Sequence, residues 1–460
     1  MVFNTKMIFA LLFLCFSATC VFAGDPTLEF EWKVTYGTIA PLGVPQQGIL
    51  INGQGPDWNL LLLPYHRSPQ GLWWYRYAQG PQPTLIPVPF DNPAEEYPVL
   101  LGDWYNKGHK SLKNILDSGR SIGRPDGIQI NGQSSNVGDA NAKPLFTFEA
   151  GKTYRFRVCN VGLRLSVNFR VQGHTMKVVE VEGSHTVQNV YDSLDLHVGQ
   201  CMSVLVTADQ TPKDYYFVAS SRFAQHPLST VAVIRYANGN GAASPELPPP
   251  PPENTKGIAW SISQFRSFRW NLTASAARPN PQGSYKYGKI NITRTIKLVN
   301  TRSSSNGKLR FGINGRASKG DKVEVAPNVV NGTYRNFVEI IFENHEKTIQ
   351  TWHLDGFSFA VAIEPGRWSP EKRKNYNLLD ALSRNTVQVY PNSWAAVMTT
   401  LDNAGMWNLR SEMRERAYLG QQLYLSVVSE ARSLRDEYSL PETQELCGIV
   451  KSLPKPAPYT

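Results

Sequence analysis

The residue types that bind transition metals are sparse in this chain of 460 residues. It contains five cysteines and eight histidines, the latter at positions 66, 109, 174, 185, 197, 226, 345 and 353, and no two histidines are separated by a single residue. A His-x-His pair on a strand would direct two imidazoles to the same face, because alternate side chains point to the same side. Copper chemistry that depends on such pairs therefore lacks its ligands here.

Other catalytic patterns are also weak. Ser184 and His185 stand in a short stretch that predicts a turn between strands, and they lack the Gly-x-Ser-x-Gly pattern of a nucleophile elbow. Asp103, Asp192 and Asp195 do not stand out from solvated carboxylates as an acid–base pair. The chain has no phosphate-binding glycine loop and no Cys-x-x-Cys motif. These residues therefore identify no enzymatic site.

Residues 1–23 have the pattern of a secretory signal peptide. Lys6 precedes an apolar run at 7–16, and the small residue Ala23 suits cleavage. The run is too short to span a bilayer comfortably, and no second apolar span follows it. We therefore expect a secreted protein that does not span a membrane.

The chain is basic, with a formal net charge of +10, and cleavage of the signal peptide removes one lysine and no acidic residue. In a secreted protein, such a charge suggests retention on an anionic polysaccharide or a membrane surface. The charges are scattered, so an ordinary solvated surface is the alternative. Nucleic acid is not expected as a partner outside the cell.

Three cysteines remain once the signal peptide is removed. Cys159 and Cys201 lie at the edges of predicted strands and could form a disulfide, which leaves Cys447 without an assigned partner. N-glycosylation sequons, which predict surface positions, occur at Asn271, Asn291 and Asn331.

Short runs rich in Val, Ile, Thr and aromatic residues predict an all-β chain with many turns. Alternating side chains predict the first strand at 30–36, and a short helix is expected at 111–118. Further strands are expected at 97–101, 153–158, 165–171, 176–181, 203–207, 215–218, 231–236, 295–299, 337–342, 357–362, 386–390 and 423–427. Short strands at such spacing favour β-sandwiches.

Five consecutive prolines, 248–252, mark a domain boundary because such a run forms an extended, semi-rigid spacer. Residues 55–84 show no sustained alternation of apolar and polar side chains, unlike the rest of the chain. The sequence therefore predicts a signal peptide at 1–23 and three domains, at 24–90, 91–240 and 257–460, the last with a C-terminal tail. A proline-rich linker is expected at 241–256.

Several stretches share a pattern with one family, namely 352–359, 364–370, 405–412 and 433–438, together with 204–210 and 451–454. They resemble multicopper oxidases, and most closely the plant branch of non-catalytic homologues called ascorbate-oxidase-like or pollen-specific proteins. The resemblance covers roughly 26–54 and 85–460. It implies three tandem cupredoxin-like Greek-key β-sandwiches with an incomplete first domain, and the absent part would hold the partner of Cys447.

The family holds its copper with two C-terminal frames, HPxHLHGH and HCHxxxHxxxxM. By resemblance, the type 1 copper positions are occupied here by Gln350, Ser411, Arg416 and Gln421. The trinuclear and remaining frame positions are occupied by His353, Asp355, Phe357, Arg410 and Glu412. A type 1 site needs a Cys thiolate, two His and a weak axial Met. The resemblance thus implies a vestigial site with no metal cofactor, and copper only if the ancestral chemistry were retained.

Two interpretations of these positions are open. In the first, His353 is a buried polar residue that is hydrogen-bonded inside a sandwich. In the second, Asp355, Glu412, Arg410 and Arg416 form a network of ion pairs that fills the former site.

The resemblance implies a secreted glycoprotein of the plant apoplast and cell wall that supports pollen-tube and wall growth without catalysis. One alternative is a copper-dependent oxidase of the L-ascorbate oxidase type, acting on ascorbate or phenolics. The other is a truncated isoform with no function of its own.

Overall fold

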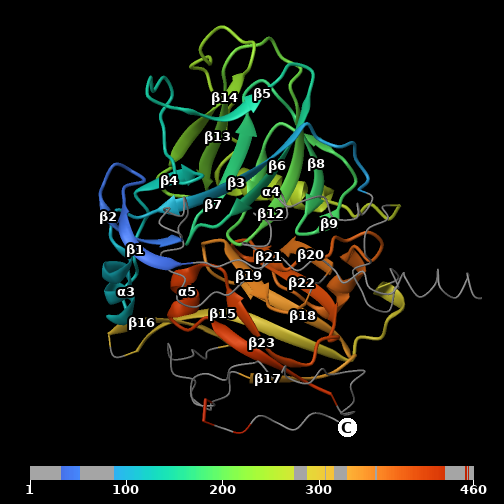
Figure 1. Ribbon diagram of the computed structural model, residues 1–460. Helices are drawn as coiled ribbons and strands as arrows, with labels where there is room; N and C mark the ends of the chain where they lie inside the picture. Colours follow the sequence, from blue (N-terminus) through green and yellow to red (C-terminus); the bar gives the residue numbers. More distant parts are fainter. Residues whose placement is uncertain are drawn as a thin grey trace, which may run out of the picture.

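The computed structural model describes residues 33–51, 88–273, 287–305, 307–314, 329–357, 360–429, 451–452 and 454. Two β-sandwiches dominate it, one built from the middle of the chain and one from the C-terminal part, and a long helix lies between them (Figure 1). The prediction of an all-β fold of cupredoxin-like sandwiches is confirmed.

The N-terminal part is described only as a β-hairpin. Strands β1 (Val34–Ile39) and β2 (Gln46–Ile51) pair antiparallel with Gly37 opposite Gly48, so the strand predicted at 30–36 is found in part and its first residues lie outside the described ranges. The Tyr36 ring stacks on His109 of helix α3 (His109–Asp117), with 5.7 Å between ring centroids. The rest of the predicted first domain, 52–87, lies outside the described residues.

The first sandwich packs two sheets around one apolar core. One sheet has the order β10-β8-β12-β6-β3-β4, with β9 paired to β8, and the other has the order β11-β7-β13-β14-β5. Its strands are β3 (Glu95–Trp104), β4 (Gly127–Ile130), β5 (Pro144–Phe148), β6 (Thr153–Asn160), β7 (Ser166–Val171), β8 (Met176–Val181), β9 (Ser184–His185), β10 (Val190–Tyr191), β11 (Leu194–Leu196), β12 (Cys201–Thr207), β13 (Tyr215–Arg222) and β14 (Ser229–Tyr236).

Strand β7 illustrates how this sandwich is covered on both faces. Val167, Phe169 and Val171 point into the core, as the period of two predicts. The intervening Arg170 is buried as well, because its Nε donates a hydrogen bond to the carbonyl of Pro248 at 2.8 Å. The proline-rich segment therefore lies along the outer face of this sheet.

A disulfide joins β6 to β12. Cys159 and Cys201 lie directly opposite each other in the antiparallel register, and their Sγ atoms are 2.10 Å apart. The link ties together the two strands at the middle of the first sheet.

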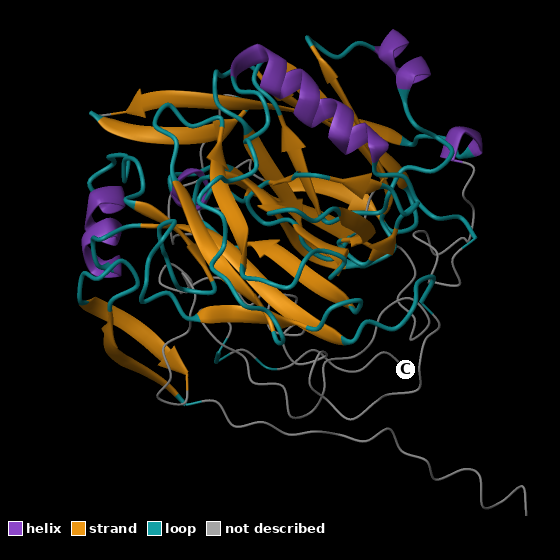
Figure 2. Cartoon of the chain, turned by 90° about the horizontal axis from the view of Figure 1, so that it is seen from above, coloured by secondary structure: helices purple, strands orange, loops and turns teal. Residues whose placement is uncertain are grey.

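Helix α4 (Asn254–Ser267) follows the prolines and connects the two sandwiches. Ser261 Oγ donates to the Asp195 carboxylate of the first sandwich at 2.7 Å, whereas Phe265 packs in the core of the second. The predicted boundary at 256/257 therefore falls inside a helix that the sequence patterns did not indicate. Figure 2 shows it as the longest helix, lying across the strands.

The second sandwich is formed by sheets of order β16-β15-β18-β22-β20 and β17-β24-β23-β19-β21. Its strands are β15 (Arg294–Ser305), β16 (Lys308–Ile313), β17 (Val329–Thr333), β18 (Phe337–Asn344), β19 (Gln350–Leu354), β20 (Ala360–Pro365), β21 (Thr386–Val389), β22 (Ser393–Thr400), β23 (Gly405–Ser411) and β24 (Gln422–Val428). Its short helices are η2 (Tyr287–Lys289), η3 (Pro370–Asn375) and α5 (Arg414–Tyr418).

The strand predicted at 357–362 begins later than expected. Gly356 has a φ of +78°, which forms a turn after β19, and Phe357 is buried in the core rather than paired in a sheet. The strand β20 then covers Ala360–Pro365.

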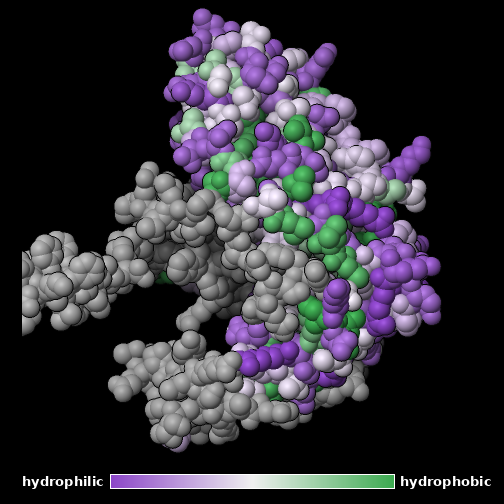
Figure 3. Space-filling model, turned by 90° about the vertical axis from the view of Figure 1, so that its right-hand side faces the viewer, coloured by the Kyte–Doolittle hydropathy of each residue, from purple (hydrophilic) through white to green (hydrophobic). Residues whose placement is uncertain are grey.

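The described surface in Figure 3 is largely polar, and apolar side chains are interspersed as small patches. None of the helices in the described ranges combines the length and the apolar character that crossing a bilayer requires.

Candidate functional site

The two C-terminal frames lie side by side in the second sandwich. Strands β19 and β23 pair antiparallel near the middle of their sheet, with His353 opposite Arg410 and Trp352 opposite Ser411. Every residue of β19 is buried. The pairing therefore brings the ligand positions of both frames into one region.

Three of the type 1 positions hold neutral, fully buried polar side chains: Gln350, Ser411 and Gln421 are each 0 % exposed. Gln350 Nε2 donates to Asn344 Oδ1 at 3.3 Å, and Gln421 Nε2 donates to the carbonyl of Gly312 at 3.4 Å. The backbone N–H of Ser411 donates to the carbonyl of Gln421 at 3.1 Å, which keeps these two residues adjacent. Within the described residues, both glutamine Oε1 atoms and the Ser411 Oγ have no hydrogen-bond partner.

The trinuclear positions hold a histidine–carboxylate contact and arginine–carboxylate ion pairs. His353 Nε2 lies 3.1 Å from Asp355 Oδ1. Arg410 lies between two acids, with Nη1 at 2.7 Å from Asp355 Oδ2 and Nη2 at 3.2 Å from Glu412 Oε1. Arg414 Nη2 lies 2.7 Å from Glu412 Oε2. We call these five residues, His353, Asp355, Arg410, Glu412 and Arg414, the charged cluster.

The spacing of the charged cluster follows from strand geometry. His353 lies on β19 and Arg410 on β23, and Asp355 and Glu412 follow the ends of these strands, each two residues further along. The backbone N–H groups of Asp355 and Glu412 continue the pairing, to the carbonyls of Asn408 at 3.0 Å and Thr351 at 2.9 Å, so each pair points to the same side as on a strand. Both interpretations of the sequence therefore describe part of the site. His353 is buried and hydrogen-bonded, and Asp355, Arg410 and Glu412 form ion pairs.

Burial differs across the charged cluster. The side chains of Arg410 and Glu412 are each 3 % exposed, whereas that of Asp355 is 38 % exposed. Partial burial opposes ionisation of Asp355, but the hydrogen bond to His353 and the charge of Arg410 outweigh it, so the pKa of Asp355 lies below its ordinary value. Burial lowers the pKa of the Arg414 guanidinium, and the Glu412 carboxylate opposes this effect. Asp355 is therefore the solvent-facing side of the cluster.

Arg416 does not join the charged cluster, so that part of the network interpretation is wrong. Its Nη2 lies 2.6 Å from Glu346 Oε2 and donates to Thr348 Oγ1 at 2.9 Å, and its guanidinium lies 4.5 Å from the centre of the Phe311 ring. Arg414 and Arg416 are two residues apart on α5, which corresponds to about 200° around a helix. They therefore point to opposite sides.

Phe357, at the last ligand position of the first frame, is part of the apolar core. It is buried, and its ring meets Trp407 edge to face with centroids 5.7 Å apart. No polar atom is available on this side chain to hold a metal.

The charged cluster is connected to the first sandwich through Thr386. His353 Nδ1 lies 2.9 Å from Thr386 Oγ1. The Glu182 carboxylate accepts hydrogen bonds from the backbone N–H groups of Asn385 at 2.7 Å and of Thr386 at 3.0 Å. Burial raises the pKa of Glu182, although the nearby Arg384 charge opposes this. The interface between the sandwiches thus fixes the position of His353.

The other residues considered as catalytic candidates in the sequence make contacts that stabilise the fold, or are exposed. Ser184 and His185 form the short strand β9 rather than a turn, and Ser184 Oγ donates to the carbonyl of Ser383 at 2.7 Å. Asp103 and Asp195 are buried rather than solvated: Asp103 accepts backbone hydrogen bonds, and Asp195 pairs with a buried arginine. Asp192 is exposed.

The sequon asparagines are accessible to different degrees. Asn291 and Asn331 are exposed, whereas Asn271 is half-buried and its Oδ1 accepts a hydrogen bond from Thr273 Oγ1 at 2.7 Å. A glycan on either exposed asparagine would extend into solvent.

Four residues of this region are not among those that the sequence patterns indicate: Arg414, Glu346, Thr386 and Glu182. Arg414 stands between two ligand positions of the second frame, so the alternation of charge in Arg410, Glu412 and Arg414 could have indicated it. The other three come from distant segments, and no local pattern marks them. In the part of the chain that the structure describes, no three His, Cys, Asp or Glu side chains are grouped so as to hold a metal ion.

Comparison with family models matches residues 95–239 and 294–433 to multicopper oxidase domains. An L-ascorbate oxidase homolog of Nicotiana tabacum is 60 % identical, with 99 % of each chain covered. The monocopper oxidase-like protein SKU5 of Arabidopsis thaliana is 36 % identical over 95 % of this chain and 92 % of its own length. An L-ascorbate oxidase of Cucurbita pepo var. melopepo is 27 % identical over 76 % of this chain and 73 % of its own length.

Solved structures share the fold. Fet3p, described as a multicopper oxidase that functions in iron import, has a TM-score of 0.63 at 17 % identity, with 86 % of this chain and 89 % of that chain covered. The alignment with the tobacco relative runs over 550 positions and spans 99 % of both sequences, whereas this chain has 460 residues. The relative therefore has internal sequence that this chain lacks.

Proposed function

Because the chain belongs to the multicopper oxidase family, in a group with plant L-ascorbate oxidase homologs and monocopper oxidase-like proteins, we propose that it is a secreted cell-wall glycoprotein without copper centres. Ion pairs occupy its trinuclear positions, and mostly neutral polar side chains occupy its type 1 positions. It supports wall growth, as in a pollen tube, without turning over a substrate. The observation that carries this proposal is the position of Arg410 between Asp355 and Glu412.

The type 1 positions do not fit copper. Copper in such a site is held by a thiolate and two imidazoles, which are soft or intermediate ligands. Here the corresponding side chains are the hydroxyl of Ser411, the carboxamides of Gln350 and Gln421, and the guanidinium of Arg416. The first three are neutral, and the last is a cation that already pairs with Glu346 at 2.6 Å. Electron transfer through Ser411 has no thiolate to start from.

The trinuclear positions do not fit copper either. The carboxylates of Asp355 and Glu412 could bind a cation, but each has a guanidinium nitrogen 2.7 Å away. A copper ion bound to either oxygen would lie next to that positive charge, and Coulomb repulsion at a few ångströms is unfavourable even when solvent screens it. His353 supplies the single imidazole of the cluster. We derive no reaction step through copper at this site.

Secretion and a wall partner are part of the proposal. The signal-peptide pattern at 1–23 and the exposed sequons at Asn291 and Asn331 support a glycosylated secreted protein. The net charge of +10 supports retention on an anionic wall polysaccharide.

A copper-dependent oxidoreductase is the competing function, favoured by the match to L-ascorbate oxidases. Oxygen uptake with ascorbate or a phenol as reductant, after incubation of the secreted protein with copper, separates the two. The Cucurbita pepo enzyme serves as the positive control. We expect uptake no faster than that of free copper in buffer. Uptake that saturates with substrate and scales with protein would contradict the proposal.

The variant Ser411→Cys sharpens this test. It restores the thiolate alone, while Gln350 and Arg416 still lack imidazoles. We expect no blue-copper absorbance from this variant. A blue band would mean that the neighbouring side chains can rearrange to bind copper, and the proposed loss of function would then rest on one residue only.

A further inference from the structure

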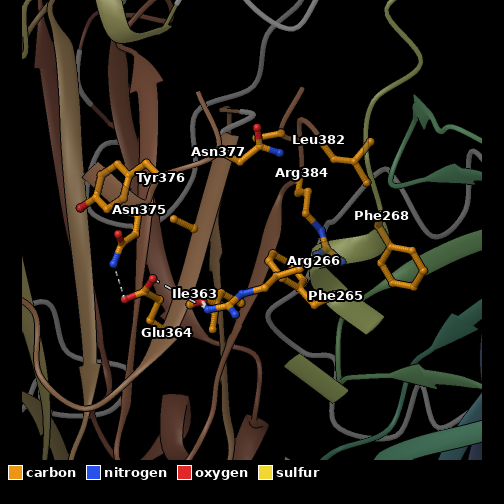
Figure 4. A pocket seen from close by; sticks show the side chains of 12 residues that line it. Phe265, Arg266, Phe268, Ile363, Glu364, Asn375, Tyr376, Asn377, Leu382 and Arg384 are labelled. Atoms are coloured by element: carbon orange, nitrogen blue, oxygen red, sulfur yellow. Dashed lines mark hydrogen bonds and ion pairs between the residues drawn. The ribbon is translucent and has the colours of Figure 1, made fainter. Parts of the chain in front are cut away.

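A pocket of about 560 Å³ opens between helix α4 and the second sandwich, and none of its lining residues belongs to the charged cluster. One wall is the end of α4 with Phe265, Arg266 and Phe268, and another is strand β20 with Ile363 and Glu364 (Figure 4). The loop 375–384 completes it. Its volume is in the range of pockets that enclose a small organic ligand.

The walls of the pocket combine rings with hydrogen-bonding groups. Phe265, Phe268 and Tyr376 are buried and line it. Tyr376 is fixed by its hydroxyl, which donates to Glu339 Oε1 at 2.9 Å. Such rigid apolar surfaces suit the C–H faces of a sugar ring, while a few polar groups set its orientation.

Two arginines line the pocket. Arg384 is only 2 % exposed and its guanidinium lies 5.0 Å from the centre of the Phe265 ring. Among the described residues, its Nε and Nη1 have no hydrogen-bond partner. Burial lowers the pKa of Arg384, and the Glu182 charge compensates in part. These two nitrogens are themselves buried, so Arg384 favours an anion in the pocket through its positive charge rather than through these donors.

Arg266 lies at the mouth of the pocket and is 51 % exposed. Its Nη2 donates to the carbonyl of Ile363 at 2.8 Å, which holds the guanidinium over the opening. A guanidinium has five N–H donors and binds a carboxylate with two parallel hydrogen bonds. Among the described residues, its contacts with the Ile363 carbonyl and the Glu364 carboxylate both involve Nη2, which leaves Nε and Nη1 for a ligand.

Glu364 is the single acid among the lining residues, and its charge is already balanced. Asn375 Nδ2 donates to its carboxylate at 3.2 Å, Lys372 Nζ lies 3.7 Å away, and Arg266 Nη2 lies 3.9 Å away. Figure 4 shows Glu364 between Asn375 and Arg266. Its oxygens can therefore accept hydrogen bonds from ligand hydroxyls without repelling an anion strongly.

We propose that this pocket binds a uronic acid unit of an acidic oligosaccharide, with the ring against Phe265 and Phe268 and the carboxylate bound by Arg266 in the positive field of Arg384. The inference rests on the proposed function in one respect, because it assigns a site to the anionic polysaccharide proposed there. It adds the ligand class and the residues that recognise it.

Calorimetric titration of the full secreted protein with trigalacturonate tests the site. We expect binding that weakens at least about tenfold when trigalacturonate is replaced by its methyl ester, because esterification removes the charge that the arginines recognise. The variant Arg266→Gln is expected to weaken binding of the acid by about the same factor. This half-exposed side chain can be replaced without disturbing the core.

A matched control is Arg235→Gln. Arg235 is 53 % exposed and pairs with Asp214 at 2.9 Å, but it lies on strand β14 of the first sandwich, away from the pocket. Unchanged affinity in this variant, together with the loss in Arg266→Gln, supports the proposal. No binding of trigalacturonate, equal binding of acid and ester, or equal loss in both variants overturns it. None of these results involves copper or oxygen uptake, so a failure here is distinct from a failure of the proposed loss of copper chemistry.

Discussion

Replacing Arg410 by alanine should destabilise the second sandwich by about 3 kcal/mol. Removing one partner of a buried ion pair costs about 3–5 kcal/mol, because the other charge is left uncompensated. Glu412 is buried but keeps Arg414 at 2.7 Å, and Asp355 keeps His353 at 3.1 Å and its exposure to solvent. These remaining partners place the expected loss at the lower end of the range.

Urea unfolding measures this loss as a decrease in the transition midpoint with little change in slope. The control is Arg235→Ala, which breaks a pair between a half-exposed arginine and the single carboxylate of Asp214. Exposed pairs contribute about 0–1 kcal/mol. The variant Arg410→Met keeps most of the side-chain volume and should lose most of the same stability, because the carboxylates are still deprived of their cation.

A small effect would refute the reasoning. If Arg410→Ala unfolded within about 1 kcal/mol of the parent, like Arg235→Ala, the charged cluster would not stabilise the former copper site. If Arg410→Met were as stable as the parent while Arg410→Ala were not, packing of the side-chain stem would explain the loss.

Three further predictions concern other features. The pKa of Asp355 lies below its ordinary value, so its ionised form stabilises the fold above about pH 4, and this contribution is lost as the pH falls further. In urea unfolding at a series of pH values, Asp355→Asn should therefore reduce the loss of unfolding free energy below about pH 4. An unchanged loss at acid pH would contradict the ion pair. Replacing Cys159 and Cys201 by alanine should cost about 4 kcal/mol in the same assay, given their sequence separation of 42, and an unchanged midpoint would show the disulfide to be unimportant. In a eukaryotic secretory host, Asn291→Gln and Asn331→Gln should each increase gel mobility, whereas unchanged mobility would show that the sequon is unused.

The strands were predictable because their apolar residues alternate, as in β7. Helix α4 was not, because its buried face includes Gly257 and the polar Ser261 and Gln264. These two polar residues are buried because both bond to Asp195 of the first sandwich. Ser261 donates to the Asp195 carboxylate, and Gln264 Oε1 accepts a hydrogen bond from the backbone N–H of Asp195. A short apolar stripe of Ile258, Ile262 and Phe265 packs in the core of the second sandwich. The buried polar residues on the other side interrupt the pattern in the sequence, so the helix is held by apolar packing on one side and by tertiary hydrogen bonds on the other.

The two frames predict the ligand positions, and the fold explains why strands β19 and β23, which carry them, lie side by side. The sequence does not predict which acid each arginine pairs with. The frame predicts Arg416 in the network because this residue occupies a ligand position, but the turn of α5 directs Arg414 to Glu412 and Arg416 to Glu346. Sequence spacing fixes neither the start of a five-residue helix nor the distant acid that it faces.

Copper content is the most direct test of the central claim that the residues at the former ligand positions no longer hold copper. Elemental analysis of the secreted protein, produced with copper in the medium and freed of loosely bound metal, should find no stoichiometric copper, and an absorbance scan should lack the blue band. Stoichiometric copper together with that band would contradict the account. The residues at the type 1 positions would then bind copper although they supply neither the thiolate nor the two imidazoles of such a site.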